Sequence, residues 1–470
     1  MRSEFGGLSI ALRALLAQQQ ALETTGHNIA NTNTEGYSRQ VVRMRASNAI
    51  TLPGVEGQLG TGVEVATVER LRSAFFDNQI RTQSHGLGRY ETTEEFLQQI
   101  ELAFNEPSES GISGALGRFF NAWREVSSQP EAISARRALV ARAEEVATLL
   151  NTAARNLNAL QQDADRRVQL RVDDINSLAQ QIALLNDRIA RVQATGDRPN
   201  DLRDERDRLL TRLSRIVDFI SSEDSEGRVT VTIGGRNLVQ GIDAFRMATS
   251  INASSLRDVV WYADNVAATL TGGQLYGLLL ARDGNVATRL SDLNSLASTL
   301  VSQVNTLHAA GFGLPTSVLP TGSTGDNFFN PTGTTAVTIT VSATITGDPN
   351  RVAASTAASS AGNGANALAI ANLQASQVMV SNTQTIEEFF TGIMTRLGAD
   401  TQQATLARET QETLVEHMRK LQAAQAGVNL DEEAARLIQY QRAYQGAARV
   451  MTAIDELIDL IVNRLGAGGR

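Results

Sequence analysis

The sequence contains no cysteine, which excludes disulfide bonds, thiol nucleophiles and cysteine-bound metals. Aromatic residues are also scarce, at 5% of the 470 residues, although 42% of the residues are hydrophobic. Any core must therefore be built from Leu, Ala, Ile and Val, and this composition favours long helices over a compact enzyme fold. A chain of this length is expected to form several domains.

Charge and hydropathy exclude further classes of protein. The net charge of −8 and the pI of about 5.3 argue against a nucleic-acid binder. No apolar run reaches the length needed to span a bilayer, so we expect no membrane insertion. The N-terminus lacks the apolar core and the small-residue cleavage site of a secretory signal, and these features alone would indicate a cytoplasmic protein.

The sequence offers little that could perform catalysis. No two histidines lie at metal-ligand spacing, and no HExxH, GxSxG, Walker A or GxGxxG motif occurs in a suitable context. We therefore expect no enzyme activity, no cofactor and no metal. Arg203 with Asp207 and Asp204 with Arg208 are spaced i,i+4, and we interpret them as weak surface pairs on a solvated helix face.

The last part of the chain predicts a long helix that needs a partner. Asn429 is a good N-cap, and Glu432 completes a capping-box pattern before a segment that ends near Leu465. Two sets of apolar or aromatic residues repeat every seven positions, namely Leu430, Leu437, Tyr444, Met451, Ile458 and Leu465, and Tyr440, Ala447, Ile454 and Ile461. This a/d pattern is typical of a coiled-coil seam.

The N-terminal segment predicts a second amphipathic helix. Its apolar positions recur at spacings of three and four, softened by Gln19 and Gly26: Leu8, Leu12, Leu15, Leu22 and Ile29. The helix should stop within IANTNTEGYSRQ, where Asn31 and Gly36 are turn formers. For Asn28, Asn31, Gly36 and Tyr37, both an ordinary helix stop and an assembly contact are open interpretations.

The middle of the chain alternates between helical and extended patterns. Residues 41–68 indicate an extended or hairpin-like segment, and residues 73–216 are mostly helical, with the longest pattern at 130–192. Short strands separated by turns are predicted between 217 and 263, and another at 337–346. Further helical patterns lie at 286–307, 367–373, 385–397 and 401–426.

These patterns predict an elongated α+β fold with three parts. Residues 1–40 and 428–470 would form a terminal coiled-coil module in which the two end helices pair antiparallel. Residues 41–217, 282–312 and 367–427 would form a helical-bundle rod. Residues 218–281 and 313–366 would form an outer β domain at the far end of that rod. Pairing between molecules would cover the terminal seams equally well.

The two ends of the chain resemble the terminal motifs of bacterial flagellar axial proteins. LSIALRALLAQQQALETTGHNIANTNTEGYSRQ is similar to the N-terminal motif, and its ending is typical of the hook-associated family at the hook–filament junction. GVNLDEEAARLIQYQRAYQGAARVMTAIDELIDLIVNRL is similar to the C-terminal motif. NDLRDERDRLLTRLSRIVDF, VNTLHAAGF and DNFF resemble internal segments of the same family, in the same order.

The resemblance implies a structural role. Members of this family form a ring of subunits between hook and filament, with terminal helices coiled in an inner tube and β domains facing outward. The implied partners are neighbouring copies, the hook protein, a second junction protein on the filament side and a cytoplasmic export chaperone on the C-terminal helix. Members are secreted by the flagellar type III system without a cleaved signal peptide, which replaces the cytoplasmic expectation.

The resemblance also assigns an interface and one departure. The expected assembly and chaperone interface comprises Leu8, Leu12, Leu15, Leu22, Ile29, Asn28, Asn31, Gly36, Tyr37, Leu437, Tyr440, Tyr444, Met451, Ile454, Ile458, Ile461 and Leu465. Longer members insert a further β domain after the segment matching DNFF, and only about 40 residues remain here between Phe329 and Leu368. We therefore expect the outermost β domain to be reduced or absent.

Two alternatives remain at this stage. The first is another flagellar axial protein, such as a hook or distal-rod protein, although the NTEGYSRQ ending and the long internal helical segment argue against it. The second is a secreted coiled-coil adhesin or effector unrelated to flagella, which would not predict matched motifs at both ends.

Overall fold

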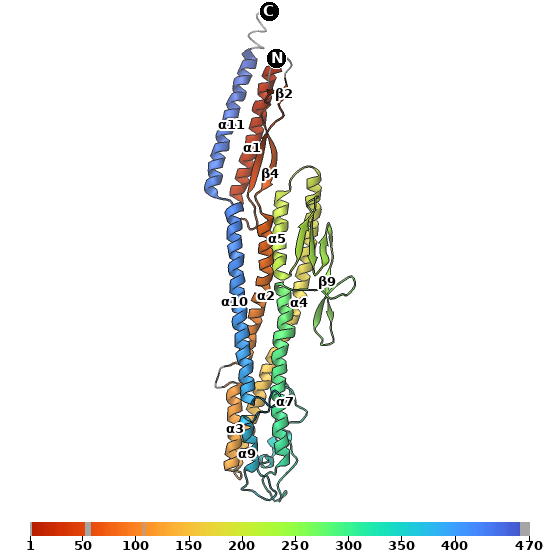
Figure 1. The fold of residues 1–470 in the computed structure, drawn as a ribbon, viewed down its shortest axis with the longest axis vertical. Coiled ribbons are helices and arrows are strands. Elements are labelled where there is room, and N and C mark those ends of the chain that lie inside the picture. The colour runs from red at the N-terminus through yellow and green to blue at the C-terminus, as the bar shows by residue number, and fades with distance from the viewer. Residues whose placement is uncertain (1, 52–57, 107, 109, 461–470) are drawn as a thin grey trace, which may run out of the picture.

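The computed structural model describes residues 2–51, 58–106, 108 and 110–460 and shows a long helical rod with a narrower module at one end (Figure 1). The long helices run along the rod, and both described ends of the chain lie in the narrow module. The α-helices are α1 (Arg2–Ala30), α2 (Ala74–Phe104), α3 (Ile112–Ser128), α4 (Ile133–Ala194), α5 (Asn200–Ile216), α6 (Gly273–Leu279), α7 (Ala287–Ala310), α8 (Ala343–Gly347), α9 (Ala365–Ala371), α10 (Ile386–Ala426) and α11 (Leu430–Asp459).

The strands are short and form small antiparallel sheets. They are β1 (Gln40–Ala46), β2 (Ile50–Thr51), β3 (Gln58–Leu59), β4 (Val63–Arg70), β5 (Ile220–Glu223), β6 (Val229–Ile233), β7 (Arg236–Gln240), β8 (Asp243–Ala244), β9 (Met247–Ile251) and β10 (Arg257–Trp261). Strands β1 and β4 pair with each other, as do β2 with β3 and β9 with β10, and a four-stranded sheet has the order β5-β6-β7-β8. The extended segment expected at 41–68 is therefore a β-hairpin.

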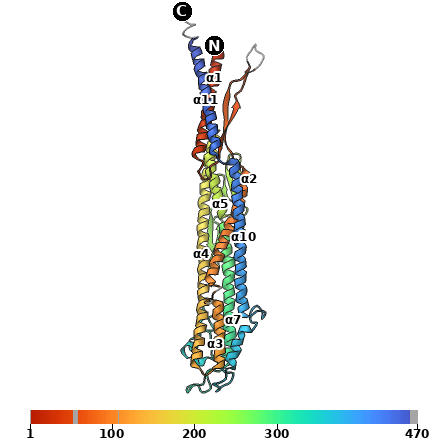
Figure 2. The same cartoon turned by 90° about the vertical axis from the view of Figure 1, so that its left-hand side faces the viewer.

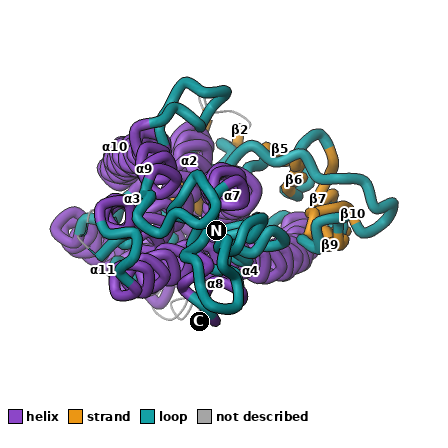
Figure 3. Tube along the Cα trace, turned by 90° about the horizontal axis from the view of Figure 1, so that it is seen from below, coloured by secondary structure: helices purple, strands orange, loops and turns teal. Residues whose placement is uncertain are grey.

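The rod has two hydrophobic cores, and α4 passes through both. At the end far from the termini, α3 contributes Phe119 and Trp123, which pack against Phe328 and Phe329. Nearer the termini, the second half of α4 packs against α5, α6 and the β strands. The view from the far end shows the helices bundled, with β5, β6, β7, β9 and β10 gathered on one side (Figure 3).

The expectation that the β strands sit at the far end of the rod is wrong. The sheet β5–β8 and the hairpin β9–β10 lie beside α4, on the half nearer the termini (Figure 1). Strand β6 alternates buried and half-buried residues, so one face covers the apolar side of α4. Two buried α4 residues complete the attachment: Asn186 bonds the backbone of Val229, and Asn176 bonds the backbone of Met247.

The predicted strand at 337–346 is also wrong, and residues 313–366 do not join the sheets. This segment has turns, short helices and isolated bridges, and its apolar residues enter the far core, where Ile339 is fully buried. Asn151 of α4 donates hydrogen bonds to the carbonyls of Ala336 and Ile339. The alternating pattern thus reflects a buried loop held by helix side chains rather than a strand. The domain boundaries otherwise stay a prediction.

Candidate assembly module and its joint to the rod

The terminal module consists of α1, the strands β1–β4 and α11. Helices α1 and α11 run antiparallel, because Glu433 at the start of α11 meets Asn28 near the end of α1, whereas Ile454 meets Gly7 near the start of α1. The β1–β4 hairpin packs on another side of α1, where Arg13 donates hydrogen bonds to Ser47 Oγ and Thr61 O. The module extends beyond the rod as an antiparallel pair of helices with a β ribbon beside it (Figure 2).

Small residues form the buried stripe of α1. The apolar side chains of α1 that are most buried are all alanines, Ala11, Ala17 and Ala21, at 3% exposed or less. A Cβ atom added to Gly7 would lie 3.2 Å from Ile454 Cδ1, so glycine allows the two helices to approach closely there. At this point α1 therefore accepts the large Ile454 side chain against a residue that has none.

The predicted seam on α11 faces α1, with exceptions. Half-buried positions are Leu437, Tyr440, Met451, Ile454 and Ile458. Tyr444 is exposed, and Ile461 and Leu465 lie outside the described residues. On α1, the predicted residues Leu8, Leu15, Leu22 and Ile29 are half-buried, but Leu12 is 46% exposed. The predicted leucines of α1 are thus less buried than Ala11, Ala17 and Ala21 of the same helix.

A second apolar stripe on α11 was not anticipated from the sequence. Gly446, Val450, Ala453, Leu457 and Leu460 are spaced by four and three residues, so they share one helix face, and we call them the outward seam. All five are exposed in the chain, Val450 at 52% and Leu457 at 58%. Leu16 of α1, also exposed, adds to the apolar surface of the module. A contiguous exposed apolar stripe marks an interaction surface.

Asn28 ties three segments together at the base of the module. Its side chain is buried, and its Nδ2 donates to Gln40 O at 2.8 Å and to Glu433 Oε2 at 2.9 Å. Its Oδ1 accepts hydrogen bonds from the Tyr37 hydroxyl at 2.7 Å and from Gln40 N at 2.9 Å. The amide uses both donors and two acceptor positions, so the residue links α1, β1 and α11.

The other residues of the N-terminal motif either end helix α1 or make tertiary contacts. Asn31 Nδ2 donates to His27 O, and Asn31 Oδ1 accepts from the Thr34 hydroxyl, which ends α1 locally. Gly36 has a φ of +84°, a left-handed conformation that suits glycine. The Tyr37 ring meets His27 edge-on at 5.4 Å, and burial together with nearby carboxylates raises the pKa of Tyr37.

Two buried ions join the motif to α11. Arg39 Nε donates to Glu433 Oε1 at 2.7 Å, and Arg39 also pairs with exposed Glu432. Glu433 is only 1% exposed and receives the Asn28 hydrogen bond as well. A buried ion pair with further hydrogen bonds fixes geometry, since removing either partner leaves the other charge uncompensated. The base of α11 is therefore held by polar contacts.

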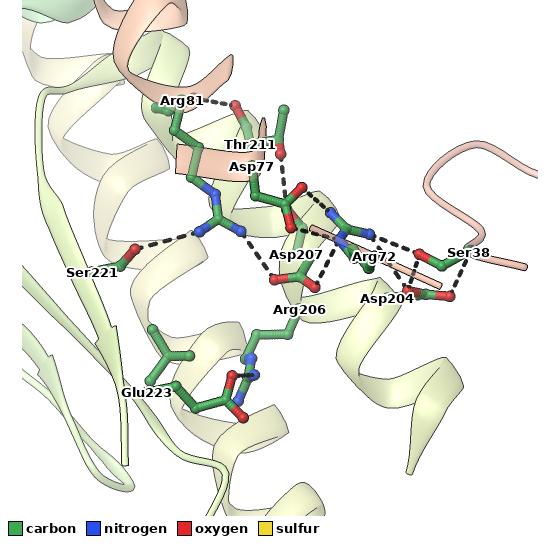
Figure 4. A network of polar contacts seen from close by, with 12 residues as sticks. Ser38, Arg72, Asp77, Arg81, Asp204, Arg206, Asp207, Thr211, Ser221 and Glu223 are labelled. Atoms are coloured by element: carbon green, nitrogen blue, oxygen red, sulfur yellow. Dashed lines mark hydrogen bonds and ion pairs between the residues drawn. The ribbon is translucent and has the colours of Figure 1, made fainter. Parts of the chain in front are cut away.

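A buried charge network connects this motif to the rod (Figure 4). The backbone N and the hydroxyl of Ser38 donate to Asp204 at 2.9 and 2.7 Å. Arg70 bridges Asp204 and Asp207 at 2.6 and 3.0 Å, and Arg72 reaches the same two carboxylates at 3.4 Å. The network thus spans the loop before β1, the end of β4 and helix α5.

The interpretation of these α5 charges as solvated surface pairs is wrong. Asp204 and Asp207 are buried, and the arginines that pair with them come from other elements rather than from one turn along α5. Burial would raise the pKa of Asp207, but Arg72, Arg70 and Arg81 outweigh this effect and hold the pKa below its ordinary value. Residue spacing identified the α5 carboxylates but not the arginines that pair with them, because these arginines lie more than 100 residues away in the chain.

This arrangement positions the terminal module against the rod. In the described part of the chain, no group of three or more His, Asp or Glu side chains could hold a metal ion. Across the same residues, no helix is long and apolar enough to cross a membrane. What the site provides is an exposed apolar seam on a module that buried ions hold in a defined orientation.

Comparisons with known proteins also distinguish the rod from the terminal module. A model described as the flagellar hook-associated protein FlgK helical domain matches residues 97–329, which lie in the rod. The flagellar hook-associated protein 1 of Bacillus subtilis is 32% identical over 515 aligned residues, covering all of both chains. This chain belongs to the flagellar hook-associated protein 1 family.

The other matches fit the family assignment. The flagellar hook-associated protein 1 of Escherichia coli is 27% identical, over 96% of this chain and 98% of that one. Models for flagella basal body rod proteins and for the C-terminal part of flagellar basal body rod FlgEFG proteins match residues 8–37 and 424–465, the two ends of the hook-associated chain. They cover α1 from Leu8 onward with its motif, and the segment that contains α11.

Structural comparison supports the same fold. The flagellar hook junction protein FlgK from Burkholderia pseudomallei aligns with a TM-score of 0.65 at 18% identity, over 73% of this chain and 99% of that one. As a hook-associated protein 1, the chain is a structural axial protein of the bacterial flagellum, at the junction between hook and filament. The family assignment decides against both alternatives, the hook or rod protein and the unrelated adhesin.

Proposed function

We propose that this chain joins hook to filament by packing its terminal module against neighbouring copies through the outward seam of α11. The observation that carries the proposal is the exposed 4-3 stripe from Gly446 to Leu460, on a helix whose adjacent face already packs on α1. A helix with two apolar seams needs two partners, and the chain itself supplies one. Neighbouring copies in a ring supply the other.

The finer roles of the predicted interface follow from this division. Inward residues such as Ile454 and Ile458 pack α11 against α1 within one chain, while the outward seam contacts the next copy. The hook protein and the second junction protein meet the two ends of the ring. Before assembly, a cytoplasmic chaperone covers α11, because an exposed seam would otherwise pair prematurely. The chain then leaves through the flagellar type III system without a cleaved signal peptide.

A charge in the outward seam tests this proposal. We expect Leu457→Asp to abolish filament attachment, because the carboxylate would lose its water on packing without gaining a partner. The free energy of unfolding of the isolated chain should change by less than about 0.5 kcal/mol, since Leu457 is 58% exposed there. Electron microscopy of cells that carry only the variant, with urea unfolding of the purified protein, provides both measurements.

Gln445→Asp is the matched control, since Gln445 is exposed on α11 and lies on neither seam. It should leave filaments attached. Assaying the culture medium separates assembly from export: an assembly defect leaves Leu457→Asp secreted, whereas a chaperone defect alone keeps it in the cell. Normal filaments on Leu457→Asp cells would contradict the proposed seam.

A further inference from the structure

One helix of the rod changes its winding partway along its length. Between α6 and α7, residues Leu280–Val286 form a π-helix, η1, so α6, η1 and α7 make one continuous helix from Gly273 to Ala310. A π-helix closes hydrogen bonds between residues five apart instead of four, so each of its turns holds about one residue more than an α turn. Such segments are rare and occur often at functional sites.

The helix has different neighbours on the two sides of η1. Its first part, α6, packs on α2, α4 and α5, whereas α7 packs on α4, α9 and α10. Leu275, Leu278 and Ala281 belong to the core nearer the termini, which we call the near core. Val286 is the first residue of this helix in the far core. The passage from one core to the other therefore falls inside η1.

The apolar pattern of the helix shifts by one residue across η1. From the end of η1 onward, the residues packed in the far core are spaced by four and three: Val286, Leu290, Leu293, Ala297, Leu300 and Val304. Continued toward α6, this spacing reaches Asp283 and Leu279, but Asp283 is exposed and Leu279 is only half-buried. The buried positions lie one residue earlier, at Arg282 and Leu278. The helix therefore contains one surplus residue between its two registers, and η1 holds it.

Packing fixes the register on each side of η1. In α6, a Cβ atom added to Gly277 would lie 2.8 Å from the carbonyl oxygen of Arg89 on α2, so a larger residue cannot move into this position. In α7, Leu293 and Leu300 are completely buried in the far core. A shift by one residue would turn them by about 100° around the helix axis. The surplus residue therefore cannot leave η1 without breaking one of these two contacts.

The contacts that hold η1 in place come from its sides. Arg282 is 1% exposed, and its guanidinium donates a hydrogen bond to Asp165 of α4 at 2.8 Å and another to the carbonyl of Arg257 in β10. The carbonyl of Arg282 accepts a hydrogen bond from Gln161 Nε2 of α4 at 3.2 Å. Gly284, inside η1, has no side chain to pack, and glycine weakens a helix relative to alanine.

We propose that η1 is a joint in the rod, a short segment that opens locally while both cores stay folded. The register mismatch, the glycine and the small number of lateral contacts give η1 a lower local stability than the helix on either side. Opening of η1 uncouples α6 from α7. A movement of the near half of the rod is then not transmitted through this helix to the far core.

Amide hydrogen exchange of the purified full chain, followed by mass spectrometry, measures this opening. We expect amides of residues 280–287 to exchange about tenfold faster, or more, than those of residues 277–279 and 293–304. Low urea concentrations should change the fast exchange very little, because a local opening exposes little surface. Equal protection of the three segments would overturn the joint. So would exchange at 280–287 that rises with urea as steeply as in the flanking helices.

Deletion of Gly284 tests the register mismatch. Removing one residue from η1 joins the patterns of α6 and α7 into a single spacing of four and three, so we expect a continuous α-helix. The urea midpoint of unfolding should stay the same or rise, and exchange at residues 280–287 should slow to the level of the flanking helices.

Deletion of Ser295 is the matched control, because Ser295 is exposed on α7, where the pattern has no surplus residue. Its loss turns one part of α7 by about 100° relative to the other and should lower the urea midpoint. If deletion of Gly284 lowered the midpoint as much as deletion of Ser295, η1 would hold no surplus residue and the proposal would fail.

Gln161→Ala tests the lateral contacts without changing the length of the chain. Loss of its hydrogen bond to the Arg282 carbonyl should speed exchange at residues 280–287 by about two- to tenfold and leave residues 293–304 unchanged. Gln162→Ala is the control, because Gln162 is the exposed neighbour on α4 and should have no effect. Identical exchange in both variants would count against the joint, since opening would then not break the contacts that hold η1.

Discussion

The rod and the terminal module use similar heptad patterns with opposite results. In the rod, Leu293 and Leu300 of α7 are completely buried within one chain. In the terminal module, the described part of α11 has only one buried residue, and it is the carboxylate Glu433. The same spacing of apolar residues therefore makes a finished core in one region and an unfinished one in the other.

This difference shows which interactions stabilise each region. Several neighbouring helices and a loop cover the rod helices, whereas α11 has α1 on one side and solvent on the other. Apolar burial stabilises the rod, but polar contacts orient the module through Asn28, Arg39 and the charge network. Apolar surface therefore stays exposed on α11 while polar contacts hold the orientation of the module.

Breaking the charge network should have the largest effect on the isolated chain. Asp207→Ala removes a buried carboxylate that faces Arg70, Arg72 and Arg81, and leaves their charges uncompensated. We expect the free energy of unfolding to fall by about 3–5 kcal/mol. Asp187→Ala is the control, because Asp187 pairs with exposed Arg191 on the surface of α4 and should contribute only about 0.3–0.5 kcal/mol. Equal losses in urea unfolding would show that burial does not distinguish the two sites.

Matched leucine truncations compare the two regions directly. Leu300→Ala creates a cavity in the rod and should lower the free energy of unfolding by about 2–5 kcal/mol. Leu457→Ala in the outward seam should change it by less than about 0.5 kcal/mol in the free chain. In assembled flagella the order of effects on filament retention should reverse, because the proposed interface buries Leu457 between copies. A large unfolding effect of Leu457→Ala would remove the contrast between the regions.

A smaller effect should appear on acidification, through the far core of the rod. His308 is fully buried, Nδ1 meets Asp326 O, and Nε2 accepts a hydrogen bond from Ala353 N. Burial lowers the pKa of His308 to about 4, so the folded chain keeps the ring neutral while the unfolded chain binds a proton below pH 6.5. Stability is therefore lost as the pH falls from about 6.5 to 4.

His308→Gln isolates this contribution, because glutamine keeps one donor and one acceptor. Between pH 7 and 5, the fall in the free energy of unfolding should be about 2 kcal/mol smaller in the variant than in the unmodified chain. His85, whose pKa burial also lowers to about 4, titrates equally in both proteins. Parallel pH profiles from urea unfolding would assign the acid sensitivity to other groups.

The helices were predictable because each has a long periodic pattern. The pattern at 130–192 became α4, and the patterns at 385–397 and 401–426 became the single helix α10. The strand predicted at 337–346 does not form, because its alternating apolar residues belong to a buried loop. The backbone carbonyls of this loop accept hydrogen bonds from Asn151. For the candidate site, spacing found the half-buried α11 residues but missed Ala11, Ala17 and Ala21, the most buried apolar residues described on α1.

The sequence by itself determined the helical character, the two terminal motifs and the membership of the flagellar family, because periodicity and motifs are local properties. The tertiary structure decided which face of each helix is covered, since that depends on neighbours distant in the chain. It turned the charges Asp204 and Asp207 from apparent surface pairs into a buried joint with Arg70 and Arg72. It also left the outward seam open, because no helix among the described residues covers that face of α11.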